Sequence, residues 1–208
     1  MSAQLEHPAC VSRILEAALD VFSEHGYGAS IEQIASRANV ARQTIYNHFG
    51  GKQALFEAAL ERAMAELFAN VKTDHENLRE RLIRFGVGLR TRVLSPRSIR
   101  LHRVLTGEAP RVPDLANSFY ARCFIGSHEQ MAEVLEKAMR DGELRRDDAR
   151  EMSRLLMEML VGLDRWRMLL GGQAPDPKTE WVKVTRMVDH FLRAYAPIDE
   201  KETIPVAR

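Results

Sequence analysis

Residues 30–56 read SIEQIASRANVARQTIYNHFGGKQALF, and this stretch decides the fold of the N-terminal part of the chain. Its apolar residues recur at intervals of about three and four on both sides of Asn39, which indicates two short amphipathic helices. Ser30 and Gln33 have the spacing of a capping box, so we expect the first helix to begin at Ser30. Asn tolerates the left-handed backbone conformation better than other non-glycine residues, and Asn39 therefore predicts a tight turn.

The second helix of this pair, expected over about residues 41–48, presents polar side chains that suit DNA. Ile45 and Phe49 supply its buried side, whereas Arg42 and Gln43 point outward, to DNA or simply to solvent. Arg pairs bidentately with guanine and Gln with adenine. Two short helices joined by a tight turn are typical of a helix-turn-helix, whose second helix enters the major groove. The residues that we expect to contact double-stranded DNA are Ser30, Arg42, Gln43, Thr44, Tyr46, Asn47, His48 and Lys52.

The same stretch resembles the DNA-binding signature of the TetR family of bacterial transcriptional regulators, I-A-x-x-A-G-V-S-x-x-T-[LI]-Y-x-[HY]-F-x-x-K-x-x-L. The resemblance covers about residues 8–60 in detail. Two positions depart from it: Asn39 replaces the turn glycine, and Ala41 replaces the Ser or Thr that caps the second helix, a cap worth about 1 kcal/mol. The positions that match are Ile34, Ala35, Ala38, Val40, Thr44, Ile45, Tyr46, His48, Phe49, Lys52 and Leu55.

The resemblance implies a homodimeric repressor that binds a palindromic or pseudo-palindromic DNA operator and is released by a small molecule. A helix-turn-helix protein that is controlled by a protein partner, without a small effector, is the alternative. The motifs of enzymes are missing: His128-Glu129 lacks the second histidine of a zinc-protease helix, and the chain has no phosphate loop, Gly-x-Ser-x-Gly or CxxC. We therefore expect no catalytic activity, cofactor or metal.

The composition limits how the chain can bind DNA. Lys and Arg number 30 against 29 Asp and Glu, so the binding surface must be a local patch, and a dimer would double it. Within residues 30–52, Arg37, Arg42 and Lys52 outnumber the single acid Glu32. The two cysteines form no disulfide framework, and neither a secretory signal nor a membrane-length apolar run is present. A cytoplasmic protein is the expectation.

The whole chain predicts an all-α fold of about nine helices, because the 3.6-residue period dominates and glycine or proline interrupts it. We expect a helix-turn-helix DNA-binding domain at residues 1–55 and a helical domain for ligand binding and dimerisation at 56–208. The expected helices lie at about 11–24, 30–38, 41–48, 52–68, 76–93, 97–108, 113–140, 147–170 and 177–195.

The last two helices carry broad apolar faces. By resemblance to the family, they pair with their copies in a four-helix bundle across a two-fold axis, and a purely intramolecular core is the alternative. The residues expected at this dimer interface are Met152, Leu156, Met159, Leu163, Trp181, Val184, Val188 and Phe191.

The helix at 113–140 has small and polar residues among large ones at four-residue intervals, a mixture that suits the wall of a cavity. The expected effector is a largely hydrophobic or aromatic small molecule, and its charge stays open. Plain core or surface is the alternative for each residue. The candidates for ligand binding are His102, Phe119, Cys123, Ser127 and Trp166.

Overall fold

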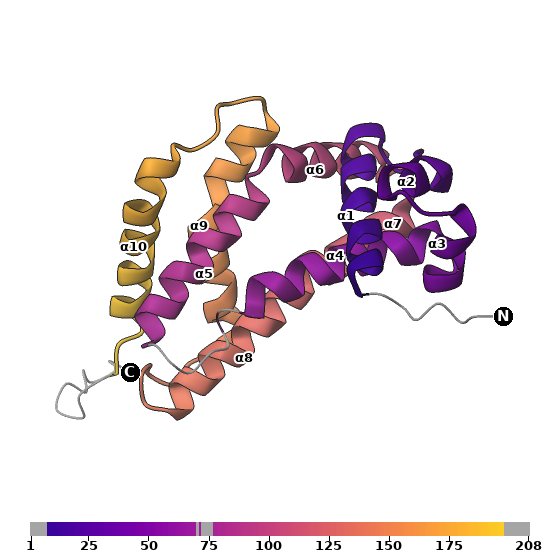
Figure 1. Cartoon of the computed structure of the whole chain (residues 1–208). Helices are drawn as coiled ribbons and strands as arrows, with labels where there is room; N and C mark the ends of the chain where they lie inside the picture. Colours follow the sequence, from indigo (N-terminus) through magenta and orange to yellow (C-terminus); the bar gives the residue numbers. More distant parts are fainter. Residues whose placement is uncertain (1–7, 70, 72–76, 198–208) are drawn as a thin grey trace.

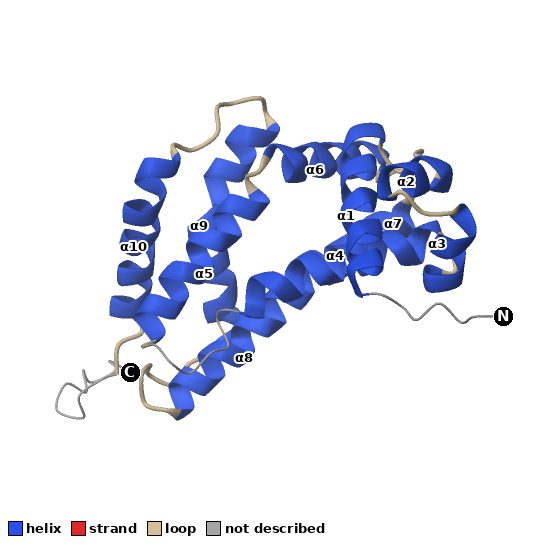
Figure 2. Ribbon diagram, in the orientation of Figure 1, coloured by secondary structure: helices blue, strands red, loops and turns tan. Residues whose placement is uncertain are grey.

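The computed structural model describes residues 8–69, 71 and 77–197, and every regular element within them is a helix (Figures 1 and 2). The predicted all-α class is confirmed. None of these helices is long and apolar enough to cross a membrane. The elements are α1 (Pro8–His25), α2 (Ile31–Ala38), α3 (Arg42–Phe49), α4 (Lys52–Ala69), α5 (Leu78–Val93), α6 (Pro96–Glu108), α7 (Pro113–Phe119), the π-helical turn η1 (Tyr120–Ile125), α8 (Gly126–Arg140), α9 (Ala149–Leu169) and α10 (Pro177–Ala194).

Most helices begin and end close to the predicted residues. The helix expected over 113–140 is continuous, but it contains the π-helical turn η1 between α7 and α8. The helix expected from residue 76 begins at Leu78, after the Asn77 side chain accepts a hydrogen bond from the Glu80 backbone N–H at 2.9 Å. Position 76 itself lies outside the described residues.

The first hydrophobic core joins α1–α3 to parts of α4, α6 and α7. Phe22 of α1 meets the ring of Phe56 on α4 edge to face, at 5.1 Å between centroids. Leu101 and Leu105 of α6 are buried in the same core. The core of the helix-turn-helix therefore continues beyond residue 55, and the predicted boundary at 55/56 stays a prediction.

The second core lies at the other end of the molecule, where α5, α8, α9 and α10 pack together (Figure 1). The far end of α4 enters it through Leu67 and Phe68, whereas Leu55 and Phe56 at the near end belong to the first core. A single helix thus belongs to both cores.

A buried ionic cluster fixes α9 and α10 to α5. Arg90 of α5 is 1% exposed and binds Asp164 of α9 at 2.7 Å and Glu180 of α10 at 2.5 Å. It also donates to the carbonyl of Leu160, close to Gly162, where α9 departs from helical geometry. Removing one partner from such a cluster leaves a buried charge without compensation, which is strongly destabilising.

The predicted dimer interface needs correction. Met152, Leu156, Val184, Val188 and Phe191 are enclosed in the second core of their own chain. A side chain with almost no exposed surface has none to offer a partner, so the prediction is wrong for these five residues. Their apolar period reports the intramolecular core, the alternative noted for these helices.

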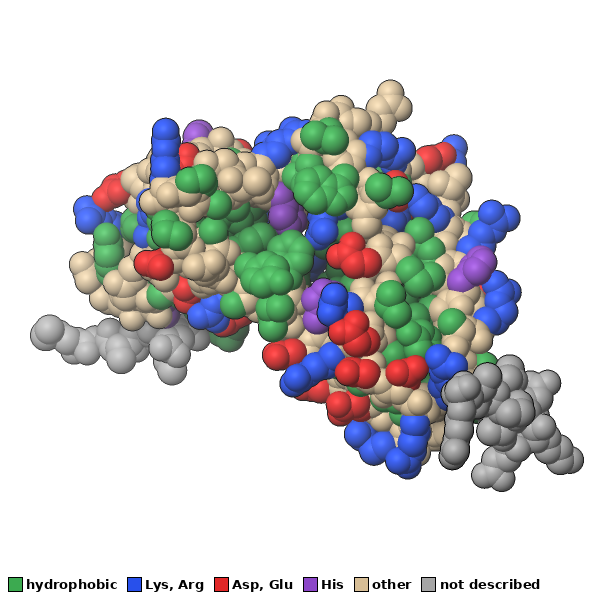
Figure 3. Space-filling view, turned by 180° about the vertical axis from the view of Figure 1, so that it is seen from behind, with side chains coloured by type: hydrophobic (Ala, Val, Ile, Leu, Met, Phe, Trp, Pro, Cys, Tyr) green, Lys and Arg blue, Asp and Glu red, His purple; other side chains and the backbone are tan. Residues whose placement is uncertain are grey.

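A different face of α9 and α10 is exposed and apolar. Leu163 is 87% exposed, and Met159 and Trp181 are also exposed, as an interface would require. Figure 3 shows hydrophobic side chains in a band over this half of the molecule, bordered by charged ones. The further exposed apolar residues of these two helices are Leu155, Trp166, Leu170 and Val182.

Gly86 of α5 lies close to side chains of α9 and α10. A Cβ atom on this residue would lie 2.7 Å from Cγ1 of Val184 and 2.9 Å from Cδ2 of Leu160. Both distances are shorter than van der Waals contact, so any larger residue here forces the side chains of Val184 and Leu160 to shift.

We expect Gly86→Ala to lower the free energy of unfolding by about 1–3 kcal/mol, because the added methyl group overpacks the second core. Gly88→Ala is the matched control on the same helix, since its Cβ would meet only Leu67 Cδ1 at 3.5 Å. Alanine there should leave stability unchanged or raise it by about 0.5–1 kcal/mol through helix propensity. Urea denaturation measures both, and equal effects would contradict the close approach.

Candidate functional site

The helix-turn-helix has the local structure that its sequence predicts. Ser30 Oγ accepts a hydrogen bond from the Gln33 N–H at 3.2 Å, and Gln33 Oε1 accepts one from the Ser30 N–H at 2.7 Å, which completes the capping box. Asn39 adopts the left-handed conformation, with φ 52° and ψ 55°. Ala41 gives α3 no side-chain cap, and the fully buried Ile45 fixes α3 to the first core.

The exposed face of α3 carries a hydrogen-bonded set of side chains. Arg42 binds Glu32 at 2.6 Å, and its Nη2 donates to the hydroxyl of Tyr46 at 3.3 Å while the guanidinium lies 5.2 Å from the Tyr46 ring centroid. Gln43 donates to Asn47 Oδ1 at 2.8 Å. These contacts hold both candidate base readers in defined rotamers, and Arg42 must exchange Glu32 for a base edge to read guanine.

The remaining DNA-contact candidates have mixed environments. Ser30 uses its oxygen in the cap, and Thr44 and His48 are half-buried. Lys52 donates to the carbonyl of Ala29 at 3.0 Å and lies 4.4 Å from the Tyr27 ring centroid, and burial lowers the pKa of its ammonium group. An ammonium group has three donors, so a phosphate contact of Lys52 stays a prediction beside this bracing role.

A cavity of about 120 Å³ lies between the helix-turn-helix end and the second core. Its walls come from α1, α4, α5, α6, α7, η1, α8 and α9 and are mostly apolar. In Figure 3, histidine side chains lie in a hollow between hydrophobic surfaces in the middle of the molecule. Leu19 of α1 is one of the lining residues, so the cavity touches the DNA-binding part directly.

Four of the five predicted ligand-binding residues line this cavity: His102, Phe119, Cys123 and Ser127. Trp166 does not line it and is 58% exposed on the outer face of α9. The reason is helical geometry. Met157, Val161 and Arg165, spaced by four, face the cavity, and Trp166 is rotated by about 100° from Arg165.

The π-helical turn changes which residues reach the cavity. A π-helix holds more residues per turn than an α-helix, and both Cys123 and its neighbour Phe124 line the cavity. Ser127 Oγ donates to the Cys123 carbonyl at 2.6 Å. Regular four-residue intervals do not predict Phe124 at the cavity, and no local pattern marks the π-helical turn. Burial raises the pKa of the Cys123 thiol to about 12, so this thiol stays protonated and is not a reactive thiolate.

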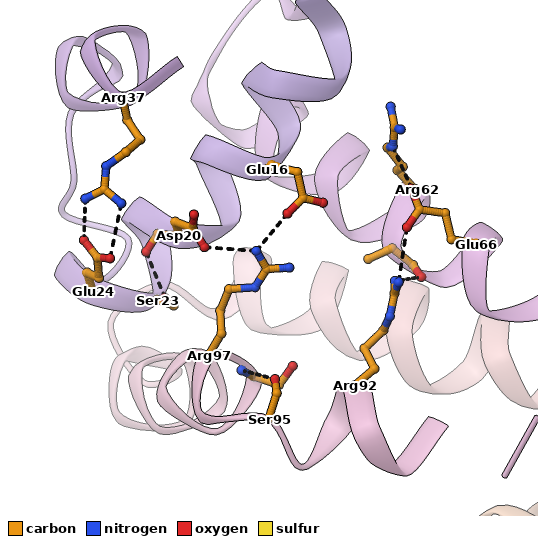
Figure 4. A network of polar contacts seen from close by, with 12 residues as sticks. Glu16, Asp20, Ser23, Glu24, Arg37, Arg62, Glu66, Arg92, Ser95 and Arg97 are labelled. Carbon is orange, nitrogen blue, oxygen red and sulfur yellow. Dashed lines mark hydrogen bonds and ion pairs between the residues drawn. The ribbon is translucent and has the colours of Figure 1, made fainter. Parts of the chain in front are cut away.

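Two arginines of the cavity wall form ion pairs with neighbouring helices (Figure 4). Arg97 of α6 binds Glu16 at 2.8 Å and Asp20 at 2.9 Å, both on α1. Arg92 of α5 binds Glu66 of α4 at 3.1 Å. The partners of Arg97 lie about 80 residues away in the sequence, so no local pattern predicts these ion pairs.

Two family models match the chain. The one described as "Bacterial regulatory proteins, tetR family" matches residues 14–59. The one described as "AefR-like transcriptional repressor, C-terminal domain" matches residues 80–197, which is more than half of the chain.

Known proteins agree with these models. The HTH-type transcriptional repressor SCO4008 of Streptomyces coelicolor is 39% identical over 71 residues, 34% of this chain and 37% of that protein. The HTH-type transcriptional regulator UidR of Escherichia coli K12 is 28% identical over 170 residues, 77% of this chain and 82% of that protein. The solved structure of the flavonoid-responsive regulator FrrA covers 93% of this chain and 100% of its own with a TM-score of 0.69, and at 23% identity it shows the fold.

The relatives are transcriptional regulators, not enzymes, and regulators of this family bind DNA and act as dimers. The matched regions include the whole of α2 and α3 and the helices α6–α10. The chain belongs to the TetR family of bacterial transcriptional regulators.

Proposed function

We propose that this regulator is a homodimeric repressor that binds a palindromic or pseudo-palindromic operator and is released by a small, largely hydrophobic effector. One observation carries the proposal: the apolar cavity includes a wall residue, Arg97, that is ion-paired to α1. A molecule that displaces α6 from inside the cavity also shifts α1 through these ion pairs. Because α2 packs against α1, the shift reaches the helix-turn-helix. We place the protein in the cytoplasm, where its DNA is.

The release mechanism is a shift between two conformations. An effector favours the conformation that it binds more tightly, and DNA affinity falls only by that difference in affinity. Leu19 and Arg97 place α1 and α6 at the cavity wall, and both helices belong to the first core. Movement of this core changes the separation of the two α3 helices in a dimer, which must match successive major grooves.

The effector class follows from the wall. Phe119 and Phe124 lie with ring centroids 5.9 Å apart. The hydroxyl hydrogen of Ser127 is already donated to the Cys123 carbonyl, and the buried Cys123 thiol is uncharged. Aromatic walls with few polar groups favour flat apolar molecules. The regulator FrrA shares this fold and is named for its response to flavonoids, which supports a planar effector here.

Dimerisation uses the exposed apolar face of α9 and α10, with Met159, Leu163 and Trp181 at its centre. A contiguous apolar surface of this kind marks an interface in a water-soluble protein. A dimer also doubles the local positive charge offered to DNA, which the near-neutral chain needs.

Arg42→Ala should weaken operator binding by about 1–3 kcal/mol and relax the preference at one base pair in each half-site. The matched control is Arg37→Ala on α2, whose guanidinium is paired with Glu24 of α1 and lies off the α3 face. Binding is measured on operators selected from random DNA, with each base pair varied in turn. Loss of affinity without loss of base preference would show that Arg42 contacts phosphate only.

Leu163→Asp should dissociate the dimer while each chain stays folded, because the new charge replaces an exposed side chain. Arg150→Asp, at an exposed position in the first turn of α9 and far along the helix from Leu163, is the control and should remain dimeric. Sedimentation at micromolar concentration gives the assembly state, and circular dichroism gives the fold. A Leu163→Asp protein that remains a dimer would place the interface elsewhere.

Arg97→Gln should uncouple the cavity from DNA. An aromatic compound found by thermal shift should bind the variant with nearly unchanged affinity, yet reduce its DNA affinity about three- to tenfold less than in the wild type. Two partly exposed ion pairs contribute at most about 1 kcal/mol each to the coupling.

Arg62→Gln is the matched control, since the partner of Arg62 among the described residues is Glu66 on its own helix (Figure 4). If the ligand lowers the DNA affinity of Arg97→Gln as much as that of the wild type, the ion pairs between α1 and α6 do not transmit the signal. If no compound both binds and releases DNA, control by a protein partner becomes the better reading.

A further inference from the structure

His102 is the polar group of the cavity wall whose chemistry the fold defines most closely. Its Nδ1 lies 2.9 Å from the backbone carbonyl oxygen of Ser98, one turn earlier on α6. A carbonyl oxygen can only accept, so Nδ1 must carry the hydrogen. In the neutral ring, Nε2 is then a bare acceptor, and no described residue donates to it.

The neutral ring is also the favoured form. Burial lowers the pKa of His102, and the positive charge of Arg165 lowers it further, whereas the bond to Ser98 opposes this shift. The imidazole therefore offers the cavity an acceptor and not a cation. A ligand group that satisfies Nε2 has to be a hydrogen-bond donor.

Aromatic rings surround this acceptor. The His102 ring meets Phe119 edge to face at 5.3 Å and Phe124 at 6.1 Å between centroids. Arg165 lies over the ring of Phe124 at 5.3 Å. A flat ring packed against these groups would have apolar contacts beside the His102 acceptor.

The volume limits the size of the ligand. The cavity measures about 120 Å³. Benzene fits an apolar protein cavity of about 150 Å³, so this slightly smaller space matches the size of about one aromatic ring and not of several.

The arginines of the cavity wall are paired with acidic residues, so they do not favour a ligand with a carboxylate group. Arg97 is neutralised by Glu16 and Asp20, and Arg92 by Glu66. Arg165 has Glu158 at 3.8 Å. A carboxylate, moreover, has no hydrogen for Nε2 of His102.

We infer that the cavity recognises a neutral single-ring phenol whose hydroxyl group donates to Nε2 of His102. This inference rests on the proposed effector role of the cavity and names the chemical class that it selects. The ligand hydroxyl donates to Nε2, which has no donor among the described residues. The ligand ring packs against Phe119 and Phe124.

The test compares three molecules that differ at one group: 4-methylphenol, its methyl ether 4-methylanisole, and toluene. Titration calorimetry on the wild-type protein should show 4-methylphenol binding roughly tenfold more tightly than either, since only the phenol can donate a hydrogen bond to Nε2. In His102→Phe the ring shape remains and the acceptor is lost. The order should then reverse, because a buried hydroxyl without a partner is penalised.

Two variants serve as controls, and thermal unfolding checks the fold of each. His102→Gln retains an acceptor oxygen and should keep part of the preference for the phenol. Phe124→Leu removes a wall ring and should weaken all three ligands alike, leaving the preference intact. Equal binding of phenol and ether to the wild type, an unchanged order in His102→Phe, or tighter binding of 4-methylbenzoate than of 4-methylphenol would each overturn the inference.

The two proposals fail separately. If the ether and toluene bind as well as the phenol and also release operator DNA, the effector role stands and the phenol inference falls. If the phenol is selected through His102 but releases no DNA, the cavity recognises phenols without acting as an effector site. Absence of binding by all three molecules contradicts the inference.

Discussion

The two halves of this regulator depend on the packing of α6 against α1, because α6 belongs to both cores: its Ile99 lies in the second core and its Leu101 and Leu105 lie in the first. Leu101 and Leu105 bury an apolar seam in the first core, and Arg97 adds two ion pairs to Glu16 and Asp20. The apolar seam supplies most of the stability, since partly exposed ion pairs contribute about 1 kcal/mol or less each. The ion pairs fix the register in which the helices meet. The same helix forms a wall of the cavity, so the contact that joins the halves is also within reach of a bound molecule.

The sequence predicted the helix-turn-helix closely because its signals are local. The Ser30 cap, the left-handed Asn39 and the uncapped Ala41 each act within three or four residues, and all three have the expected geometry. The helix order was predictable for a similar reason, since glycine and proline interrupt a clear 3.6-residue period.

The cavity and the exposed apolar face of α9 and α10 were harder to predict because they depend on long-range packing. An apolar stripe on α9 or α10 shows that a face is buried, but not by what. Phe191 and Leu163 have similar hydrophobicity, yet one fills the second core and the other lies in solvent. The π-helical turn at Tyr120–Ile125 and the Gly162 kink likewise have no local signal, and both alter which side chains share a face. Arg90 was equally hidden, because its three partners come from α9 and α10.

The shallow attachment of α3 has a consequence for how such regulators diverge. Ile45 is the only residue of this eight-residue helix that is fully buried. The exposed positions Arg42, Gln43 and Asn47 can change with little effect on folding, because substitutions of surface residues usually alter stability by no more than about 0.5 kcal/mol. A gene duplicate could therefore acquire a new set of target promoters through a few exchanges on α3, while the walls of the cavity, none of which come from α3, are inherited intact.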